Sequence, residues 1–212
     1  MSPSIYQLYA RIQPGFRNRR RKLFLERLQP GPSTRVLDVG GFVYDWEGVV
    51  PISSPITVLN RERQPTGPIP ARYTCVVGDA RKMDFADQSF DIAYSNSVIE
   101  HLGSYEDQQR FAAEIRRVAR RLFVQTPNRW FFMEPHFVVP FIHYLPGSVA
   151  RPMLRFCSVR ALLRRGDNVD LRQLASELRL LSFREMKLLF PDCEIYRETW
   201  LGLTKSFVAI RL

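Results

Sequence analysis

Five short runs of β-branched, aromatic and other apolar residues follow one another along the chain, and each stops at a glycine or a small polar residue. They cover residues 35–39, 56–59, 73–77, 90–94 and 121–125. Runs of this length, bounded by turn-forming residues, predict buried strands. Phe111, Ile115 and Val118 recur at helical spacing and predict a helix over residues 105–120. Strands that alternate with helices predict a parallel sheet with helices on both faces.

The C-terminal part of the chain has a different order of elements. Residues 180–190 predict a helix that closes at Pro191. Residues 194–200 and 205–211 predict two strands joined by a tight turn at Gly202. Because a hairpin reverses the chain, its last strand should run antiparallel to the others. The predicted fold is therefore an α/β, doubly wound, seven-stranded Rossmann-like sheet with an antiparallel last strand.

Two further segments complete the predicted organisation. Residues 17–28 have the apolar stripe of an amphipathic helix, which places an N-terminal helical segment in residues 1–30. Between residues 128 and 180 the pattern loosens into aromatic residues, prolines and short basic stretches, which predicts a cap inserted after the fifth strand. The sheet core would then consist of residues 31–127 and 181–212.

Arginine dominates the charge of the chain: 31 basic residues against 21 acidic ones give a formal net charge of +10. The basic turn at residues 17–22 and the arginines of the cap favour an anionic partner, with solvated surface charge as the alternative. Three scattered cysteines without a CxxC pair favour a reducing compartment. The longest apolar stretch, residues 130–144, is too short and too interrupted to cross a bilayer. We expect a cytoplasmic protein without a transmembrane segment, with the inner membrane surface as a further place of contact.

Small polar residues follow each predicted strand, which is where open α/β sheets bind their ligands. Asp38 ends the first strand, and Gly40 and Gly41 follow it. Glycines allow the backbone to approach a ligand closely. The bulky residues after this turn exclude the GxGxxG fingerprint of dinucleotide sites, and the GK[ST] of a P-loop is absent. The set of strand-end residues suits a ligand that contains a nucleoside.

Four motifs lie at these strand ends: Asp38-Val-Gly-Gly41, Asn60, Gly78-Asp79-Ala80, and the run FDIAYSNSVIEHL from Phe90 to Leu102. Together they resemble the class I S-adenosylmethionine-dependent methyltransferases of the small-molecule type. The resemblance covers residues 35–128 and the terminal hairpin, whose antiparallel last strand is a mark of that family. It implies S-adenosyl-L-methionine as the cofactor and methyl transfer as the reaction.

The resemblance also implies roles for single residues. Asp38 and the backbone of the two glycines would hold the amino-acid end of the cofactor, and Asp79 with the backbone of Ala80 would bind the adenine amino group. Ser95 and Asn96 would line the methionine end through backbone oxygen. The expected cofactor-binding residues are Asp38, Gly40, Gly41, Phe42, Asn60, Arg61, Asp79, Ala80, Ser95 and Asn96.

Two positions depart from the family pattern. Phe42 and Tyr44 stand where the family usually has further glycines, so their side chains must swing out or narrow the cofactor slot. Asn60 replaces the acid that usually grips the ribose, although its amide both donates and accepts hydrogen bonds. Glu62 is an alternative ribose partner. These departures leave a catalytically silent, methyltransferase-like binding protein open as a second hypothesis.

Histidine is the usual base for an oxygen or nitrogen acceptor, since its pKa lies near neutrality. The candidates for a catalytic role are His136 and His101, which lie in the cap and after the fourth strand. Glu134 is a weaker candidate, and His143 has the surroundings of a packing residue. Asp84, Asp87 and Asp91 have no histidine or suitably spaced carboxylate beside them, so we expect no metal site.

The sequence indicates only the chemical class of the methyl acceptor. The aromatic segment over residues 128–146 predicts either a helix that packs the cap onto the sheet or an apolar wall of the acceptor pocket. We expect a small-molecule, sugar or lipid-linked acceptor, with an anionic group as a further option. An RNA methyltransferase is the alternative that the net charge favours.

Overall fold

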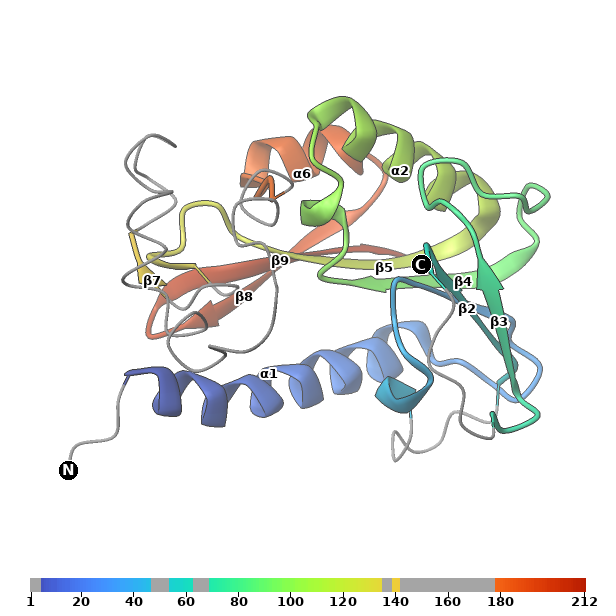
Figure 1. Ribbon diagram of the computed structural model, residues 1–212, viewed down its shortest axis with the longest axis horizontal. Coiled ribbons are helices and arrows are strands. Elements are labelled where there is room, and N and C mark those ends of the chain that lie inside the picture. Colours follow the sequence, from blue (N-terminus) through green and yellow to red (C-terminus); the bar gives the residue numbers. More distant parts are fainter. Residues whose placement is uncertain (1–4, 47–53, 63–68, 135–138, 142–177) are drawn as a thin grey trace.

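The computed structural model describes residues 5–46, 54–62, 69–134, 139–141 and 178–212. Its centre is a seven-stranded sheet with the order β3-β2-β1-β4-β5-β9-β8 (Figure 1). Strands β1 to β5 run parallel, and β9 is antiparallel to β5 and β8. The predicted fold class is confirmed, including the antiparallel last strand. The strands are β1 (Val36–Val39), β2 (Ile56–Asn60), β3 (Tyr73–Val77), β4 (Phe90–Asn96), β5 (Ala119–Pro127), β8 (Glu194–Trp200) and β9 (Leu203–Arg211).

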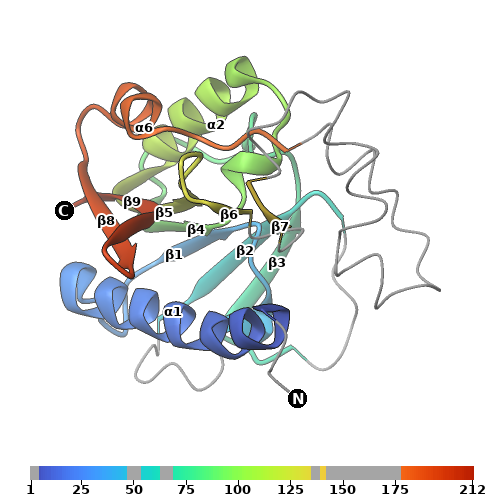
Figure 2. The same cartoon turned by 90° about the vertical axis from the view of Figure 1, so that its left-hand side faces the viewer.

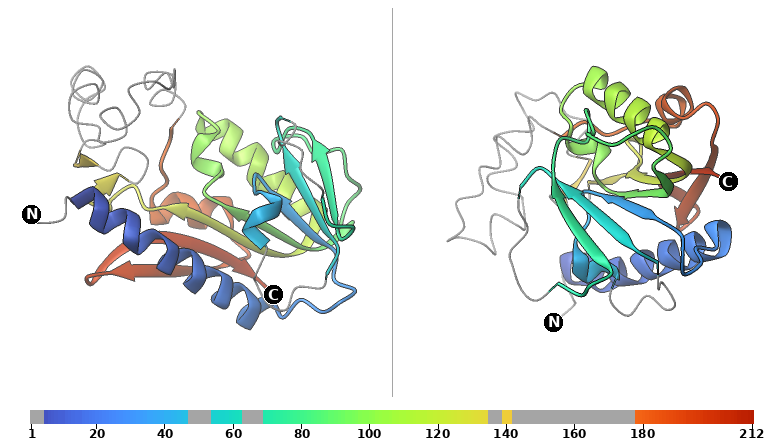
Figure 3. Two further views of the ribbon diagram at one scale, coloured as in Figure 1. Left: turned by 60° about the horizontal axis from the view of Figure 1, so that its bottom comes forward. Right: turned by 90° about the vertical axis from the view of Figure 1, so that its right-hand side faces the viewer.

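Helices cover both faces of the sheet (Figures 2 and 3). α2 (Tyr105–Val118) and α6 (Phe183–Leu189) lie on one face, and the long α1 (Ile5–Leu28) lies on the other. The side chains of β5 alternate between the two layers. Leu122 and Val124 belong to the core beneath α2 and α6, whereas Phe123 belongs to the core beneath α1. Because this strand is buried on both faces, it needs apolar residues at successive positions, which explains its uninterrupted apolar run.

α1 begins earlier than the sequence predicts and runs beside the β8–β9 hairpin (Figures 1 and 3). Phe24 anchors it: its ring makes edge contacts with Trp46, Tyr94 and Phe123 at centroid distances of 5.5, 5.3 and 5.6 Å. Burial of such a ring contributes about 2–3 kcal/mol. Trp46 reaches this core from η1 (Val43–Trp46), a short 3-10 helix between β1 and β2.

The alternation of strands and helices is interrupted between β3 and β4. The connection from β3 to β4, residues 78–89, contains no helix. Arg117 on α2 takes over the backbone groups that a helix would satisfy internally, donating to the carbonyl oxygens of Met83 and Phe85 at 2.9 and 2.7 Å. The carboxylate of Glu114 accepts from the backbone nitrogen of Met83 at 2.6 Å. A charged pair on a neighbouring helix thus fixes this loop.

The cap is described only in part. β6 (Met133–Glu134) pairs antiparallel with β7 (Val139–Pro140) just after β5. His136 and His143 lie outside the described residues. The division into an N-terminal segment, a core and a cap over residues 128–180 stays a prediction.

Candidate functional site

The turn after β1 is built around the carboxylate of Asp38. This side chain is 1% exposed, and the indole nitrogen of Trp46 donates to its Oδ2 at 2.6 Å. A Cβ added at Gly41 would lie 1.9 Å from the same oxygen, so only glycine fits where the backbone passes the carboxylate. The Asp38 carboxylate, held by the indole of Trp46, therefore fixes the path of the backbone through this turn. The role of Trp46 was not predicted, because nothing in the local sequence connects its indole to an acid eight residues earlier.

Gly40 is fixed by two neighbouring strands. Its backbone nitrogen donates to the carbonyl oxygen of Leu59 at 2.8 Å, and its φ is +77°. A Cβ at this position would lie 2.4 Å from Cγ2 of Val98, which follows β4. The turn after β1 and the segment after β4 are thus in direct contact. Glycine is needed here both for the left-handed backbone and for the close approach.

Asn60 joins the end of β2 to the same turn. Its side-chain nitrogen donates to the carbonyl oxygen of Gly41 at 2.8 Å. Ser95, on the other side of β1, is fully buried, and its hydroxyl donates to the carbonyl oxygen of Val39 at 3.1 Å. The structure therefore brings the predicted residues of β1, β2 and β4 together at one edge of the sheet.

The two residues that flank this turn are exposed. The side chain of Phe42 is 50% exposed beside the glycine turn. Arg61 is also exposed, and its charge helps to lower the pKa of Asp79. Glu62 is exposed beside it. The side chain of Tyr44 lies outside the described part of the chain.

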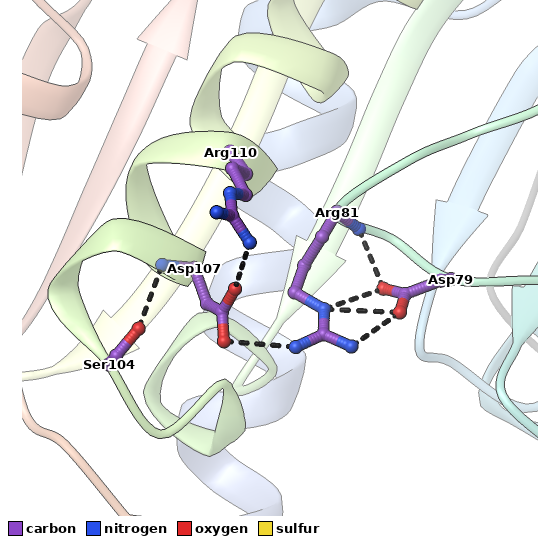
Figure 4. A network of polar contacts seen from close by, with 5 residues as sticks. All are labelled: Asp79, Arg81, Ser104, Asp107 and Arg110. Carbon is purple, nitrogen blue, oxygen red and sulfur yellow. Dashed lines mark hydrogen bonds and ion pairs between the residues drawn. The ribbon is translucent and has the colours of Figure 1, made fainter.

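Asp79 begins a chain of charged side chains at the end of β3 (Figure 4). Arg81 donates to its two carboxylate oxygens, with Nε–Oδ1 at 2.9 Å and Nη2–Oδ2 at 2.6 Å. The same guanidinium reaches Asp107 on α2, with Nη1–Oδ2 at 2.9 Å. Hydrogen bonding by Arg81 lowers the pKa of Asp79 to about 2, so this carboxylate is a fixed acceptor at neutral pH. The backbone nitrogen of Arg81 also donates to Oδ1 at 2.9 Å, so a further donor such as an amino group would share with Arg81 a carboxylate that is 37% exposed.

Asp79 and Ala80 lie next to Asn60, because the backbone nitrogen of Gly78 donates to the carbonyl oxygen of Asn60 at 2.8 Å. Sequence reasoning missed Arg81, although its spacing of two residues from Asp79 is the signal that could have indicated the ion pair.

Of the two histidine candidates, His101 lies within the described residues and His136 lies outside them. His101 ends η2 (Ile99–His101), directly after β4, and is half-buried. Its neighbour Glu100 is fully buried and accepts a hydrogen bond from the hydroxyl of Thr126 at 3.0 Å. Sequence reasoning missed this buried acid of η2, which lies against Thr126 near the end of β5. His136 remains a prediction.

Asn96 contacts a residue that sequence reasoning placed elsewhere. The basic turn over residues 17–22 was interpreted as an anion site or as solvated surface charge, but Arg20 is only 5% exposed. Its guanidinium donates to Oδ1 of Asn96 and, at 2.7 Å, to Oε1 of Gln125. For Arg20 both the anion-site and the solvated-surface interpretations are wrong, because its side chain is buried and hydrogen-bonded inside the protein.

Within the ranges described above, no three His, Cys, Asp or Glu side chains gather as metal ligands would. No helix of those ranges combines the length and the hydropathy needed to cross a bilayer.

The sheet-edge residues match the chemistry of an S-adenosylmethionine site. Gly40 and Gly41 have no side chain, so a ligand can contact their backbone closely. Asn60 supplies an amide group, and Asp79 supplies an ionised hydrogen-bond acceptor. A cofactor with an amino-acid end, two ribose hydroxyls and an adenine amino group requires donors and acceptors of these types. The residues present therefore fit the group.

Comparisons with known proteins agree with this chemistry. A family model described as a methyltransferase domain matches residues 49–122, about a third of the chain. Among curated proteins, no sequence matches the chain.

Solved structures share the fold at low sequence identity. A possible exported protein from Bordetella parapertussis superposes with a TM-score of 0.59 and 10% identity, over 93% of this chain and 67% of that chain. The 1,6-didemethyltoxoflavin-N1-methyltransferase of Burkholderia thailandensis, bound to 1,6-didemethyltoxoflavin and S-adenosylhomocysteine, has a TM-score of 0.58 and 12% identity, over 92% and 76%.

Phosphoethanolamine N-methyltransferase 2 of Haemonchus contortus, in complex with phosphomonomethylethanolamine and S-adenosylhomocysteine, has a TM-score of 0.54 and 16% identity, over 85% of this chain and 39% of that chain. The strand order and the antiparallel last strand are those of the class I methyltransferase fold, and residues 49–122 match the methyltransferase domain model, so the chain is similar to S-adenosylmethionine-dependent methyltransferases.

Proposed function

We propose that the protein transfers the methyl group of S-adenosylmethionine to a small-molecule acceptor. The observation that carries this proposal is the convergence of the glycine turn, Asn60 and Asp79 at the carboxyl edge of β1, β2 and β3. These residues come from three separate strands, and their hydrogen bonds tie the strand ends to one another. Ligands of open α/β sheets bind at this edge.

Each predicted cofactor residue has a task in this proposal. The backbone of Gly40 and Gly41 holds the amino-acid end, and Asp38 keeps the turn in shape. Asn60 and the neighbouring Arg61 and Glu62 face the ribose side. The larger set is completed by Asp79 and Ala80 at the adenine, by Ser95 and Asn96 at the methionine end, and by Phe42 at the rim.

The bound cofactor supplies a methyl group on a positively charged sulfur, which a nucleophile displaces in line. The protein has to align the acceptor and exclude water. His101 or His136 accepts the proton of a hydroxyl or amine acceptor, since the pKa of imidazole suits that task at neutral pH. Glu134 is the weaker alternative.

We place the acceptor among small molecules, including sugars, lipid-linked compounds and compounds with an anionic group. Two of the neighbours reported above hold a small molecule beside S-adenosylhomocysteine in their crystals, which supports this class over RNA. The net charge of +10 is the feature that favours RNA. A catalytically silent binding protein is the further alternative, which the replacement of the ribose acid by Asn60 favours. The expected cytoplasmic location, with contact at the inner membrane surface, stays a prediction.

The test of this proposal is a transfer experiment with S-adenosylmethionine that carries a deuterated methyl group. Purified protein is incubated with a small-molecule extract, and in parallel with RNA. Mass spectrometry should find the labelled methyl group in a small molecule that is unlabelled without protein. Label in RNA alone would establish the RNA alternative, and label in neither would leave a binding protein.

An Asp79→Ala variant should bind S-adenosylhomocysteine about tenfold more weakly, because a hydrogen bond to an ionised acceptor is worth about 1.5–3 kcal/mol. Isothermal titration calorimetry measures the affinity. Asp84→Ala removes an exposed acid from the same loop and serves as the matched control, with unchanged affinity. Equal affinities of the two variants would remove Asp79 from the adenine site.

A His136→Ala variant should slow methyl transfer at least about tenfold while it leaves S-adenosylhomocysteine affinity unchanged, since general-base catalysis contributes about 10²–10⁴-fold. Initial rates with the acceptor found by the labelling experiment provide the measurement. His143→Ala is the control from the same segment. A wild-type rate in the His136 variant would exclude this residue as the base.

A further inference from the structure

Arg20 is a buried charge at the carboxyl edge of the sheet, on the face covered by α1. Its Nη1 donates to the side-chain oxygens of Asn96, at the end of β4, and of Gln125, near the end of β5. Its Nε lies 3.4 Å from Oε1 of Glu198, whose side chain is 8% exposed. One guanidinium therefore joins α1 to three strands, with Nη1 bound to two amide oxygens and Nε facing Glu198.

The contacts continue from Gln125 into the turn after β4. The hydroxyl of Ser97 donates to Oε1 of Gln125 at 2.9 Å, and the backbone nitrogen of Ser97 donates to the Gln125 carbonyl oxygen at 3.1 Å. Ser97 has a φ of +59°, a left-handed conformation that costs a residue other than glycine about 1–3 kcal/mol. Such a conformation persists only where its surroundings hold it, and here Gln125 holds it.

The next residue carries this support to the glycine turn. Val98 packs so closely on Gly40 that a Cβ there would lie 2.4 Å from its Cγ2. The contacts therefore run without a gap from Arg20 to Gln125, from Gln125 to Ser97, and through Val98 to Gly40. Asn96, the residue assigned to the methionine end, is held directly by the same guanidinium.

We propose that Arg20 is a positioning residue of the cofactor site, which holds Asn96 and the Ser97 turn against the glycine turn. The inference rests on the proposed function and adds the N-terminal helix to the machinery that grips the amino-acid end of S-adenosylmethionine. Arg20 itself touches neither cofactor nor acceptor. Its effect should be largest at the amino-acid end of the cofactor, because its own hydrogen bonds reach β4 and β5, whereas Asp79 follows β3 on the other side of β1.

The test compares two ligands that share their nucleoside. S-adenosylhomocysteine carries the amino-acid tail, and 5′-methylthioadenosine lacks it. An Arg20→Lys variant keeps the charge, but its single nitrogen cannot occupy the positions of Nη1 and Nε at once, so it should bind S-adenosylhomocysteine about tenfold more weakly and 5′-methylthioadenosine unchanged. Arg27→Lys is the matched control on α1, where the arginine pairs with Glu194 near the surface, and it should change neither affinity.

The possible outcomes distinguish a failure of the proposed function from a failure of the role assigned to Arg20. If the wild-type protein binds neither ligand, the proposed function fails and the role of Arg20 falls with it. If the wild-type protein binds both and Arg20→Lys keeps their affinity ratio, only the role of Arg20 is overturned, and a parallel loss for both ligands would mean general structural support. Should Arg20→Lys not fold, Gln125→Asn withdraws the shared amide oxygen from Arg20 and Ser97 and undergoes the same ratio test.

Discussion

A Gly41→Ala variant will bind S-adenosylhomocysteine about a hundredfold more weakly than the wild-type protein. The added Cβ would lie 1.9 Å from Oδ2 of Asp38, so either the turn or the carboxylate must move. The carboxylate cannot move freely, because it is buried and accepts from Trp46 at 2.6 Å. The backbone that approaches the cofactor has to shift instead. Overpacking costs about 1–3 kcal/mol, and a hundredfold loss corresponds to about 2.7 kcal/mol.

The control for this variant is Gly103→Ala in the loop before α2. Gly103 has a φ of +76°, but a Cβ there meets nothing within 4 Å. Alanine should therefore lower stability by about 1 kcal/mol through backbone strain and leave ligand affinity unchanged. Calorimetric titration of both variants separates a clash in the site from a general loss of stability. Wild-type affinity in Gly41→Ala would show that the turn does not contact the cofactor.

A Lys205→Met variant will be more stable than the wild-type protein at pH 7, by about 1–3 kcal/mol. Lys205 is 6% exposed, and its Nζ lies 3.8 Å from the centroid of the Phe16 ring. Burial lowers the pKa of its amine to about 8, with Glu198 raising it and Arg20 lowering it further. The folded protein must then bury an ammonium group that the unfolded chain leaves in water. Methionine removes this cost, while Glu198 keeps its contacts with Arg20 and Ser206.

The sign of the pH dependence follows from the lowered pKa. Below pH 8 the amine is protonated in both states and the cost of burial is fully present. Between about pH 8 and pH 10.5 only the unfolded chain holds the proton, so the stability of the wild-type protein rises with pH relative to the variant. The advantage of Lys205→Met should therefore shrink over this interval, as measured by guanidinium unfolding at pH 7, 9 and 10.5. Lys187→Met, on the exposed side of α6, is the control; a constant difference for Lys205→Met would contradict the account.

The position of Lys205 also shows what the local sequence could not reveal. The pairing of β8 with β9 shifts register between Glu198 and Thr199, so that Glu198 faces Ser206 and Thr199 faces Thr204. Lys205 is the extra residue of this bulge, and its amine turns toward α1. Strict alternation would place Lys205 and Ser206 on opposite faces. A register shift depends on pairing between strands, which a single stretch of sequence does not specify.

The burial of Arg20 in α1 was likewise not predictable from the local sequence. The sequence predicts the apolar stripe with Phe24 correctly, because helical spacing is a local property. Arg19, Arg20 and Arg21 stand side by side and are alike in the local pattern. Only the contacts of Arg20 with Gln125 and Glu198, more than a hundred residues away, decide that this one is buried.

The candidate site was predictable where its residues directly follow strands. Asp38, the two glycines, Asn60 and Asp79 all lie at strand ends, and a parallel sheet collects such ends at one edge. Their partners Trp46 and Arg81 reach the site through loops whose paths the hydrophobic pattern does not determine. The geometry of the turn therefore had to come from the structure, although its position came from the sequence.

The central claim is that this sheet edge binds S-adenosylmethionine. Titration of the wild-type protein with S-adenosylhomocysteine by isothermal calorimetry tests it most directly, because it needs no acceptor. The account predicts saturable binding of one molecule per chain at micromolar concentration, and about hundredfold weaker binding in Gly41→Ala. Absence of any binding heat at millimolar ligand, with the protein folded, would contradict it.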